Sequence, residues 1–212
     1  MSELIFFFVF FLVFYAVHIV FIAPGNLVDW QIKLSLFLGI LKIENYQESA
    51  IQPNSLDVHL SNDFARQNPN GDFHTFKAES IVLEPGEFVL ATTKEYFYFP
   101  NNIHGVLQGK SSWARLGLYV ESAGLFDSGF QGEGVVELTN QGKSPLNLNA
   151  GQAIAQMIFI KNLPVQHSYA KKKHGKSNYQ GQRGARQSCL ESVVASSIKD
   201  PLKNATSSIF QS

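Results

Sequence analysis

The sequence has almost no cysteine and no excess of charge of either sign. Its 212 residues include one cysteine, Cys189, which excludes an internal disulfide and any zinc site that needs two thiolates. The 17 Lys and Arg residues balance 17 Asp and Glu residues. Because general nucleic-acid binding depends on neutralising many phosphates, this balance argues against a nucleic-acid partner. Any anion must therefore be bound by locally concentrated charge.

The N-terminal apolar run lacks basic flanks. Residues 5–23 carry no Lys, Arg, Asp or Glu and exceed the length of about 18 apolar residues that a membrane-spanning helix needs. A secretory signal is disfavoured, because Glu3 is the only charged side chain ahead of the run. Two interpretations stay open, a membrane anchor and translated sequence that the functional domain does not use. We expect a cytoplasmic protein in the second case and a membrane-anchored one in the first.

The rest of the chain alternates short apolar runs with turn residues. The pattern predicts a helix over residues 29–38, capped by Asp29 and stopped at Gly39, and a loop over residues 61–72. Strands are predicted at residues 40–46, 51–60, 80–83, 88–92, 96–99, 103–108, 134–139, 146–148 and 154–160. In the second of these, Asp57 and His59 are expected on the polar outer face. Many short strands with close turns predict an all-β barrel or sandwich.

Four segments are expected from these changes in composition. Residues 1–25 form the apolar segment, and residues 26–165 form the barrel domain. Residues 166–186 form a basic, glycine-containing arm, and residues 187–212 form a polar extension. Taken alone, the composition of the arm is typical of a solvated tail.

Residues 109–118 (GKSSWARLGL) combine a glycine, a cation and paired hydroxyl groups ahead of a short helical pattern. Ser111 or Ser112 is expected at the helix N-cap. The unpaired N–H groups and the dipole of a first helical turn favour an anion, and Lys110 and Arg115 add positive charge. The spacing is not that of a Walker loop. The alternative is an ordinary capped helix with surface cations.

Two carboxylates are candidates for chemistry. Glu137 lies in an apolar strand pattern, where an inward carboxylate is costly unless it is paired or belongs to a working site. Strand alternation could equally turn Glu137 toward solvent. Asp127 lies among glycines in residues 122–130 (SAGLFDSGF), where a role in stabilising a tight turn is the alternative.

Five stretches together resemble the dCTP deaminase branch of the dUTPase-like superfamily, over about residues 27–186. They are residues 51–57 (IQPNSLD), 109–118, 122–130, 136–138 (VEL) and 179–184 (YQGQRG), in the order and spacing of the family. The resemblance implies a distorted β-barrel or jelly roll, with an N-terminal helix, that assembles as a homotrimer with shared active sites. It also implies zinc-independent hydrolysis of dCTP to dUTP and ammonia, which supplies dUTP and dUMP for thymidylate synthesis.

The resemblance assigns the chemistry to Glu137. In the family this carboxylate takes a proton from the attacking water and then returns protons to the leaving ammonia. Arg115, Ser111 and a backbone group of Ala123 would hold the water and stabilise the tetrahedral intermediate.

Other residues are implied to bind the substrate. Asp127 would accept a hydrogen bond from the 3′-hydroxyl, and the backbone at Val135 and Val136 would contact the base. The triphosphate, with Mg²⁺ as its counter-ion, would meet the helix start and the arm, which closes as a lid. The residues concerned are Lys110, Ser112, Trp113, Ala114, Tyr169 and Gln182.

The chain departs from the family pattern in the arm. Asn178 stands where the family commonly has a phosphate-binding lysine, and Lys176 is the nearest cation that could replace it. Gly124 and Gln156 resemble a bifunctional branch that continues to dUMP and pyrophosphate, which is the first alternative. The second is a non-catalytic nucleotide-binding regulatory protein. Feedback by dTTP is a further implication of the resemblance.

Overall fold

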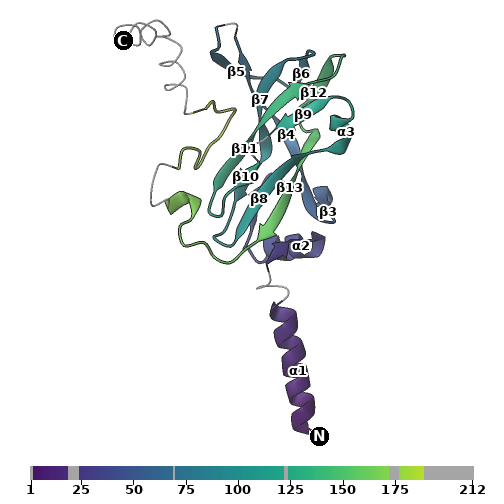
Figure 1. Cartoon of the computed structure of the whole chain (residues 1–212), viewed down its shortest axis with the longest axis vertical. Coiled ribbons are helices and arrows are strands. Elements are labelled where there is room, and N and C mark those ends of the chain that lie inside the picture. The colour runs from purple at the N-terminus through teal and green to yellow at the C-terminus, as the bar shows by residue number, and fades with distance from the viewer. Residues whose placement is uncertain (1, 19–23, 69, 122–123, 172–176, 189–212) are drawn as a thin grey trace, which may run out of the picture.

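The computed structural model describes residues 2–18, 24–68, 70–121, 124–171 and 177–188 (Figure 1). Its helices are α1 Ser2–Val17, α2 Asp29–Phe37 and α3 Ser111–Ala114, with the 3-10 turns η2 Glu48–Ala50 and η3 Tyr169–Lys171. Its strands are β1 Gly25–Asn26, β2 Lys42–Glu44, β3 Ile51–Gln52, β4 Ser55–Gln67, β5 Phe73–Lys77, β6 Ser80–Leu83, β7 Phe88–Tyr98, β8 Ile103–Gly109, β9 Leu118–Glu121, β10 Leu125–Phe126, β11 Gln131–Asn140, β12 Leu146–Asn149 and β13 Ala153–Lys161.

Eleven strands form one curled antiparallel sheet. Its main path runs β10-β8-β13-β4-β7-β11-β9, and β1, β2, β3 and β5 pair beside it. The two ends of the path both lie against β8, since β10 pairs with it at Gly105 and Val106 and β9 approaches its last residue, Gly109. A Cβ added to Gly109 would lie 3.2 Å from Val120 of β9, so the absence of a side chain permits this closure. Strands β6 and β12 form a separate pair. The prediction of an all-β barrel is confirmed.

The core fills the inside of this curl. Phe64, Phe97 and Phe159 are its largest fully buried side chains, and they come from β4, β7 and β13. Burial alternates along β11: Val136 and Leu138 are fully buried, whereas Val135, Glu137 and Thr139 are half-buried. One face of β11 therefore belongs to the core and the other is available to a site.

Strand β4 differs from the expectation in two ways. It continues to Gln67, so the predicted loop over residues 61–72 was wrong for residues 61–67; Phe64 and the next residue, Ala65, are fully buried. His59 was expected on a polar outer face but is 9% exposed. Its ring Nδ1 lies 2.6 Å from the carboxylate of Glu95, which is 0% exposed. A buried partner makes an inward histidine tolerable.

Both helix caps precede the predicted residues. Val28 precedes α2, and its N–H donates to the side chain of Gln31 at 3.1 Å, while Asp29 is already helical. Lys110, in extended conformation, precedes α3, so neither Ser111 nor Ser112 is the cap. The four residues of α3 form a single turn, which gives a weaker dipole than a long helix.

Helix α1 stands apart from the barrel at the N-terminal end (Figure 1). All twelve side chains from Leu4 to Tyr15 are apolar and between 49% and 77% exposed. Within the described residues, no helix is both long enough and apolar enough to cross a membrane. Residues 19–23 of the apolar run lie outside the described residues.

Candidate active site

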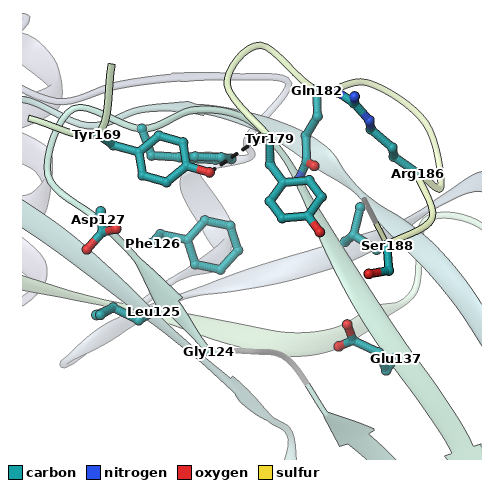
Figure 2. Close-up of a pocket in the computed structure, with 12 residues that line it drawn as sticks. Gly124, Leu125, Phe126, Asp127, Glu137, Tyr169, Tyr179, Gln182, Arg186 and Ser188 are labelled. Carbon is teal, nitrogen blue, oxygen red and sulfur yellow. Dashed lines mark hydrogen bonds between the residues drawn. The ribbon is translucent and has the colours of Figure 1, made fainter. Parts of the chain in front are cut away.

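A cavity of about 280 Å³ lies between β10, β11 and the C-terminal arm (Figure 2). Carboxylates from two different elements reach it, Glu137 from β11 and Asp127 from the turn that follows β10. Its lining residues are Gly124, Leu125, Phe126, Asp127, Phe130, Val135, Glu137, Tyr169, Tyr179, Gln182, Arg186 and Ser188. The cavity is thus apolar on its floor and acidic on two sides.

The alternation of β11 explains the position of Glu137. Its neighbours Val136 and Leu138 point into the core, so the Glu137 side chain points to the opposite face and is half-buried. That face is covered by the arm, and Figure 2 shows Glu137 opposite Ser188. Glu137 is therefore directed away from the core, and one of its carboxylate oxygens is still buried.

Asp127 is placed by a tight turn whose bonds come from the backbone. The carbonyl of Asp127 accepts from the N–H of Phe130 at 3.0 Å, and Gly129 has a φ of +86°. A Cβ on Gly129 would lie 2.6 Å from Ser168, so the turn also needs glycine for its close approach to the arm. Among the described residues, the Asp127 carboxylate has no hydrogen-bond or ion-pair partner. Its side chain faces the cavity rather than closing the turn.

The arm is attached to β11 and to the turn after β10. The ring of Tyr169 packs edge-on against Phe130 at 5.5 Å, and the hydroxyl of Tyr169 accepts from the N–H of Tyr179 at 3.3 Å. Gln182 is 8% exposed, and its Nε2 donates to the carbonyl of Glu133 at 2.7 Å. These contacts fix the covering wall of the cavity.

A buried network behind β11 supports the strand at its bulge between Glu133 and Val135. The N–H of Gly134 donates to the Thr93 hydroxyl at 2.8 Å, and that hydroxyl donates to the carbonyl of Glu95 at 2.7 Å. Burial raises the pKa of Glu95, and the hydrogen bonds from the backbone and ring of His59 oppose this shift. The network leads from the His59 and Glu95 pair to the strand that carries Glu137.

Comparison with known proteins gives the family. A family model described as dCTP deaminase-like matches residues 26–162. A protein of Methanosphaerula palustris is 35% identical over 173 residues, covering 75% of this chain and 92% of its own. One of Methanospirillum hungatei is 38% identical with the same coverage, and one of Mycobacterium tuberculosis is 37% identical, covering 74% and 90%. All three relatives are named "dCTP deaminase, dUMP-forming".

The chain belongs to the dCTP deaminase-like family. Among solved structures, the 2′-deoxycytidine 5′-triphosphate deaminase of Agrobacterium tumefaciens is similar, with a TM-score of 0.56 and 21% identity. The match covers 66% of this chain and 48% of that one, so this chain spans about half of that structure. At this identity the likeness shows a shared fold, which confirms the predicted architecture.

In this dCTP deaminase-like chain, the residues of the 109–118 loop do not line the cavity that holds Glu137. The Lys110 ammonium lies 2.6 Å from a carboxylate oxygen of Asp57, and both residues line a second cavity of about 380 Å³ together with Gln156. Ser111, Ser112, Ala114 and Arg115 are exposed. The Arg115 guanidinium makes no ion pair or hydrogen bond within the described part of the chain. The predicted site residues thus form two separate groups.

Trp113 and Gly117 hold α3 in place. The indole N–H of Trp113 donates to the carbonyl of Ala153 at 2.9 Å, and its ring packs against the core. Gly117 has a φ of +92°, and a Cβ there would lie 2.6 Å from the backbone of Gly142. Trp113 therefore anchors the loop, and its side chain is turned away from any ligand in solvent.

The remaining predicted residues are placed as follows. The Val135 side chain lines the cavity, whereas the Val136 side chain is in the core, so only the backbone of Val136 can meet a ligand. Asn178 is exposed and is not part of the cavity lining. Ala123 and Lys176 lie outside the described residues.

Sequence reasoning did not single out Arg186 or Ser188, which line the cavity. No periodicity marks either residue, and the only signal for Arg186 is its charge, two residues after the glycine that ends the YQGQRG motif. Within the described residues, no group of three or more His, Cys, Asp or Glu side chains could hold a metal ion.

Proposed function

We propose that this protein hydrolyses dCTP to ammonia and dUMP, with pyrophosphate as the third product. The observation that carries the proposal is the presence of Glu137 and Asp127 in one arm-covered cavity. The family supports it, as do relatives at 35–38% identity named dUMP-forming dCTP deaminases.

Glu137 is the proposed catalytic residue. Its carboxylate takes a proton from water as the water oxygen bonds to C4 of the cytosine ring and the π electrons of the C4–N3 double bond move to N3. N3 holds the second proton of the water once the oxygen has become the C4 carbonyl. The carboxylate then gives a proton to the amino nitrogen as the bond between C4 and that nitrogen breaks and ammonia leaves, so one group serves as base and then as acid.

Asp127 is proposed to hold the sugar. Its carboxylate faces the cavity and has no partner within the described residues, so it can accept a hydrogen bond from the 3′-hydroxyl. The backbone at Val135 and Val136, on the strand that carries Glu137, is proposed to contact the base edge. Tyr169 and Gln182 close the opposite side of the cavity.

A second copy of the chain is proposed to complete the site. Ser111, Ser112 and Arg115 are exposed and do not line the cavity of their own chain. The apolar side chains of Leu116 and Tyr119 beside them are 59% and 46% exposed, as expected of a surface that another subunit covers. In the proposed homotrimer, α3 of one subunit brings Arg115 and Ser111 to the Glu137 of the next. Lys110 and the backbone of Trp113 and Ala114 would meet the phosphates there.

The product is proposed to be dUMP rather than dUTP. The sequence placed dUTP first, but the names of the three relatives favour the dUMP-forming alternative. Gln156, which resembles that branch, lies in the cavity that also holds Lys110 and Asp57. Formation of dUMP adds one hydrolysis, in which the oxygen of a second water bonds to the α-phosphorus while the bond from that phosphorus to the oxygen bridging to the β-phosphorus breaks and pyrophosphate leaves.

Magnesium is proposed to enter with the triphosphate, and zinc is proposed to play no part. Phosphate oxygens and water are the usual ligands of nucleotide-bound Mg²⁺, so the chain needs no metal cage of its own. Removing Mg²⁺ with EDTA should stop turnover of dCTP, and added Mg²⁺ should restore it. Full activity in EDTA would contradict a magnesium requirement.

The proposal is tested by incubating the protein with dCTP and Mg²⁺ while ammonia and pyrophosphate are followed separately. We expect both products in equal amounts. Glu137→Gln should lower ammonia release by a factor of about 10² to 10⁴, the usual contribution of a general acid–base residue. The matched control is Glu48→Gln, whose side chain is 76% exposed on η2 and should have no effect.

Three outcomes would contradict parts of the proposal. Ammonia without pyrophosphate would show that dUTP is released. Turnover of dUTP but not of dCTP would show a plain dUTPase. Tight nucleotide binding with no turnover of any deoxynucleotide would show a regulatory binding protein.

A further inference from the structure

We infer that Arg186 is the phosphate-binding cation of the C-terminal arm. This inference rests on the proposed substrate, a cytosine deoxynucleotide that carries a chain of phosphates. It assigns the charged contact to a residue in the same chain as Glu137, and to neither Asn178 nor Gln182 of the arm. Arg186 would make ion-paired hydrogen bonds to the phosphates once the base and sugar occupy the cavity.

The charges around the cavity require a cation. Its lining includes the carboxylates of Asp127 and Glu137 and one positively charged side chain, Arg186. A nucleoside triphosphate brings several further negative charges, so the described walls would repel it without that guanidinium. Figure 2 shows the Arg186 side chain running along the arm in the direction of Gln182, on the side of the cavity away from Asp127.

Arg186 is available for a ligand. Within the described residues its guanidinium makes no ion pair and no hydrogen bond, whereas its backbone N–H donates to the carbonyl of Gly184 at 2.8 Å. The side chain is exposed, so the guanidinium remains hydrated until a ligand arrives. Arginine suits this task, because its planar fork of donors matches two phosphate oxygens.

The other arginine of the arm is already engaged. Arg183 lies 3.4 Å from the carboxylate of Glu133 and 3.7 Å from that of Glu44, and its guanidinium stacks 4.2 Å from the ring centre of Tyr96. Glu44, Tyr96 and Glu133 are register partners on β2, β7 and β11, so they share one face of the sheet. Arg183 therefore fastens the arm, which leaves Arg186 to face the cavity.

The neutral residues of the arm offer less to a phosphate. Gln182 is only 8% exposed, and its Nε2 already donates a hydrogen bond to the carbonyl of Glu133. Its buried Oε1 has no hydrogen-bond partner among the described residues, and an acceptor of this kind cannot bond to an ionised phosphate oxygen. Asn178 is exposed and outside the cavity lining. Arg186 is the remaining strong donor on this wall.

The test compares Arg186→Gln, Arg186→Lys and Lys176→Gln with the control Lys77→Gln, whose side chain is 71% exposed on β5. Steady-state turnover of dCTP with Mg²⁺ is measured beside turnover of deoxycytidine, which has no phosphate. Arg186→Gln should raise the KM for dCTP about tenfold or more, the effect expected from loss of one charge-assisted contact, with kcat within about twofold. It should leave kcat/KM for deoxycytidine unchanged. Arg186→Lys should recover most of the loss, because it keeps the charge.

Binding is measured independently of turnover, so that this inference and the proposed function can fail separately. Equilibrium binding of dCTP is compared between Glu137→Gln and Glu137→Gln/Arg186→Gln, and about a tenfold loss is expected in the double variant. If the wild type releases no ammonia but this loss is seen, the proposed function fails and the role of Arg186 stands.

Several results would overturn the inference. One is a KM for dCTP within about twofold of wild type in Arg186→Gln. A second is an equal loss with dCTP and deoxycytidine, which would show that Arg186 only supports the arm. A third is a loss of kcat at unchanged KM, which would show that Arg186 acts on Glu137. A loss in Lys176→Gln without one in Arg186→Gln would assign the contact to Lys176.

Discussion

Glu133 and Gln182 join the C-terminal arm to β11 by two hydrogen bonds. The N–H of Glu133 donates to the carbonyl of Gln182 at 3.1 Å, and Nε2 of Gln182 donates to the carbonyl of Glu133 at 2.7 Å. The Glu133 carboxylate adds two contacts, accepting from the N–H of Gly184 at 2.8 Å and from Arg183 at 3.4 Å. Glu133 therefore makes four hydrogen-bond contacts with the arm, and it lies on β11, the strand that carries Glu137.

The first prediction is that Glu133→Ala loosens the arm without unfolding the barrel. The backbone bonds to Gln182 survive, but the carboxylate contacts with Arg183 and Gly184 are lost. Hydrogen bonds to charged groups contribute about 1.5–3 kcal/mol, so we expect KM for dCTP to rise by about tenfold or more. Steady-state kinetics measure this rise, and hydrogen exchange at residues 181–184 should become faster. Unchanged exchange in the arm would contradict the role of Glu133, and Glu48→Ala serves as the surface control.

The second prediction concerns the two separated groups of site residues. If Glu137 of one subunit works with Arg115 of another, Glu137→Gln and Arg115→Gln should each be inactive alone but regain activity when co-assembled. Random mixing in a trimer restores about one site in four, so about a quarter of wild-type activity is expected. Activity is measured after the two chains are unfolded together and refolded. Failure to regain activity in confirmed mixed trimers would place both residues in a site of one chain.

The third prediction is a pH dependence of stability that comes from Glu95. Because burial raises the pKa of Glu95, the folded state holds its proton more tightly than the unfolded state does. Its contribution to stability is fully present below the ordinary carboxyl pKa of about 4.3 and is lost as pH rises through the raised value. We therefore expect the free energy of unfolding of wild type, relative to Glu95→Gln, to fall by about 1.4 kcal/mol for each unit of raised pKa.

Urea unfolding between about pH 4 and pH 7 measures this difference. Glu48→Gln should show no such trend, since its side chain is 76% exposed. A wild-type advantage over Glu95→Gln that stays constant or grows with pH would mean that the charged pair with His59 outweighs the burial of Glu95.

Much of the fold could be predicted from local patterns. The alternation of β11 and the turn residues around β6, β12 and β13 give these strands correctly. The second half of β4 was missed because Ser61, Asn62 and Asp63 come directly before the buried Phe64 and Ala65, and three such polar residues in a row are typical of a loop. What makes this segment a strand is its pairing with β5 and β7 on both sides, and a local pattern does not contain that information.

Local sequence patterns were limited in the same way in predicting the site. The alternation of β11 could not say whether Glu137 would meet solvent or a cavity, because the covering wall comes from the arm, about 45 residues later in the chain. The motif at residues 179–184 marked the arm, but it could not separate Arg183 from Arg186. That distinction depends on where Glu44 and Glu133 lie in the folded sheet.

The last prediction concerns α1. A chain that begins at Pro24 should unfold at the same temperature and turn over dCTP at the same rate as the full-length protein. Every side chain from Leu4 to Tyr15 is at least 49% exposed, so α1 adds nothing to the core, and β1 keeps its pairing with Ile160 and Lys161. Thermal unfolding and steady-state kinetics of both proteins measure this. A lower unfolding temperature in the shorter chain would show that α1 packs on the barrel.

Cell fractionation separates the two interpretations that the sequence left open: full-length protein in the membrane fraction would support an anchor, because a helix that is apolar all round needs an apolar environment. Full-length protein in the soluble fraction would show that the domain does not use this segment.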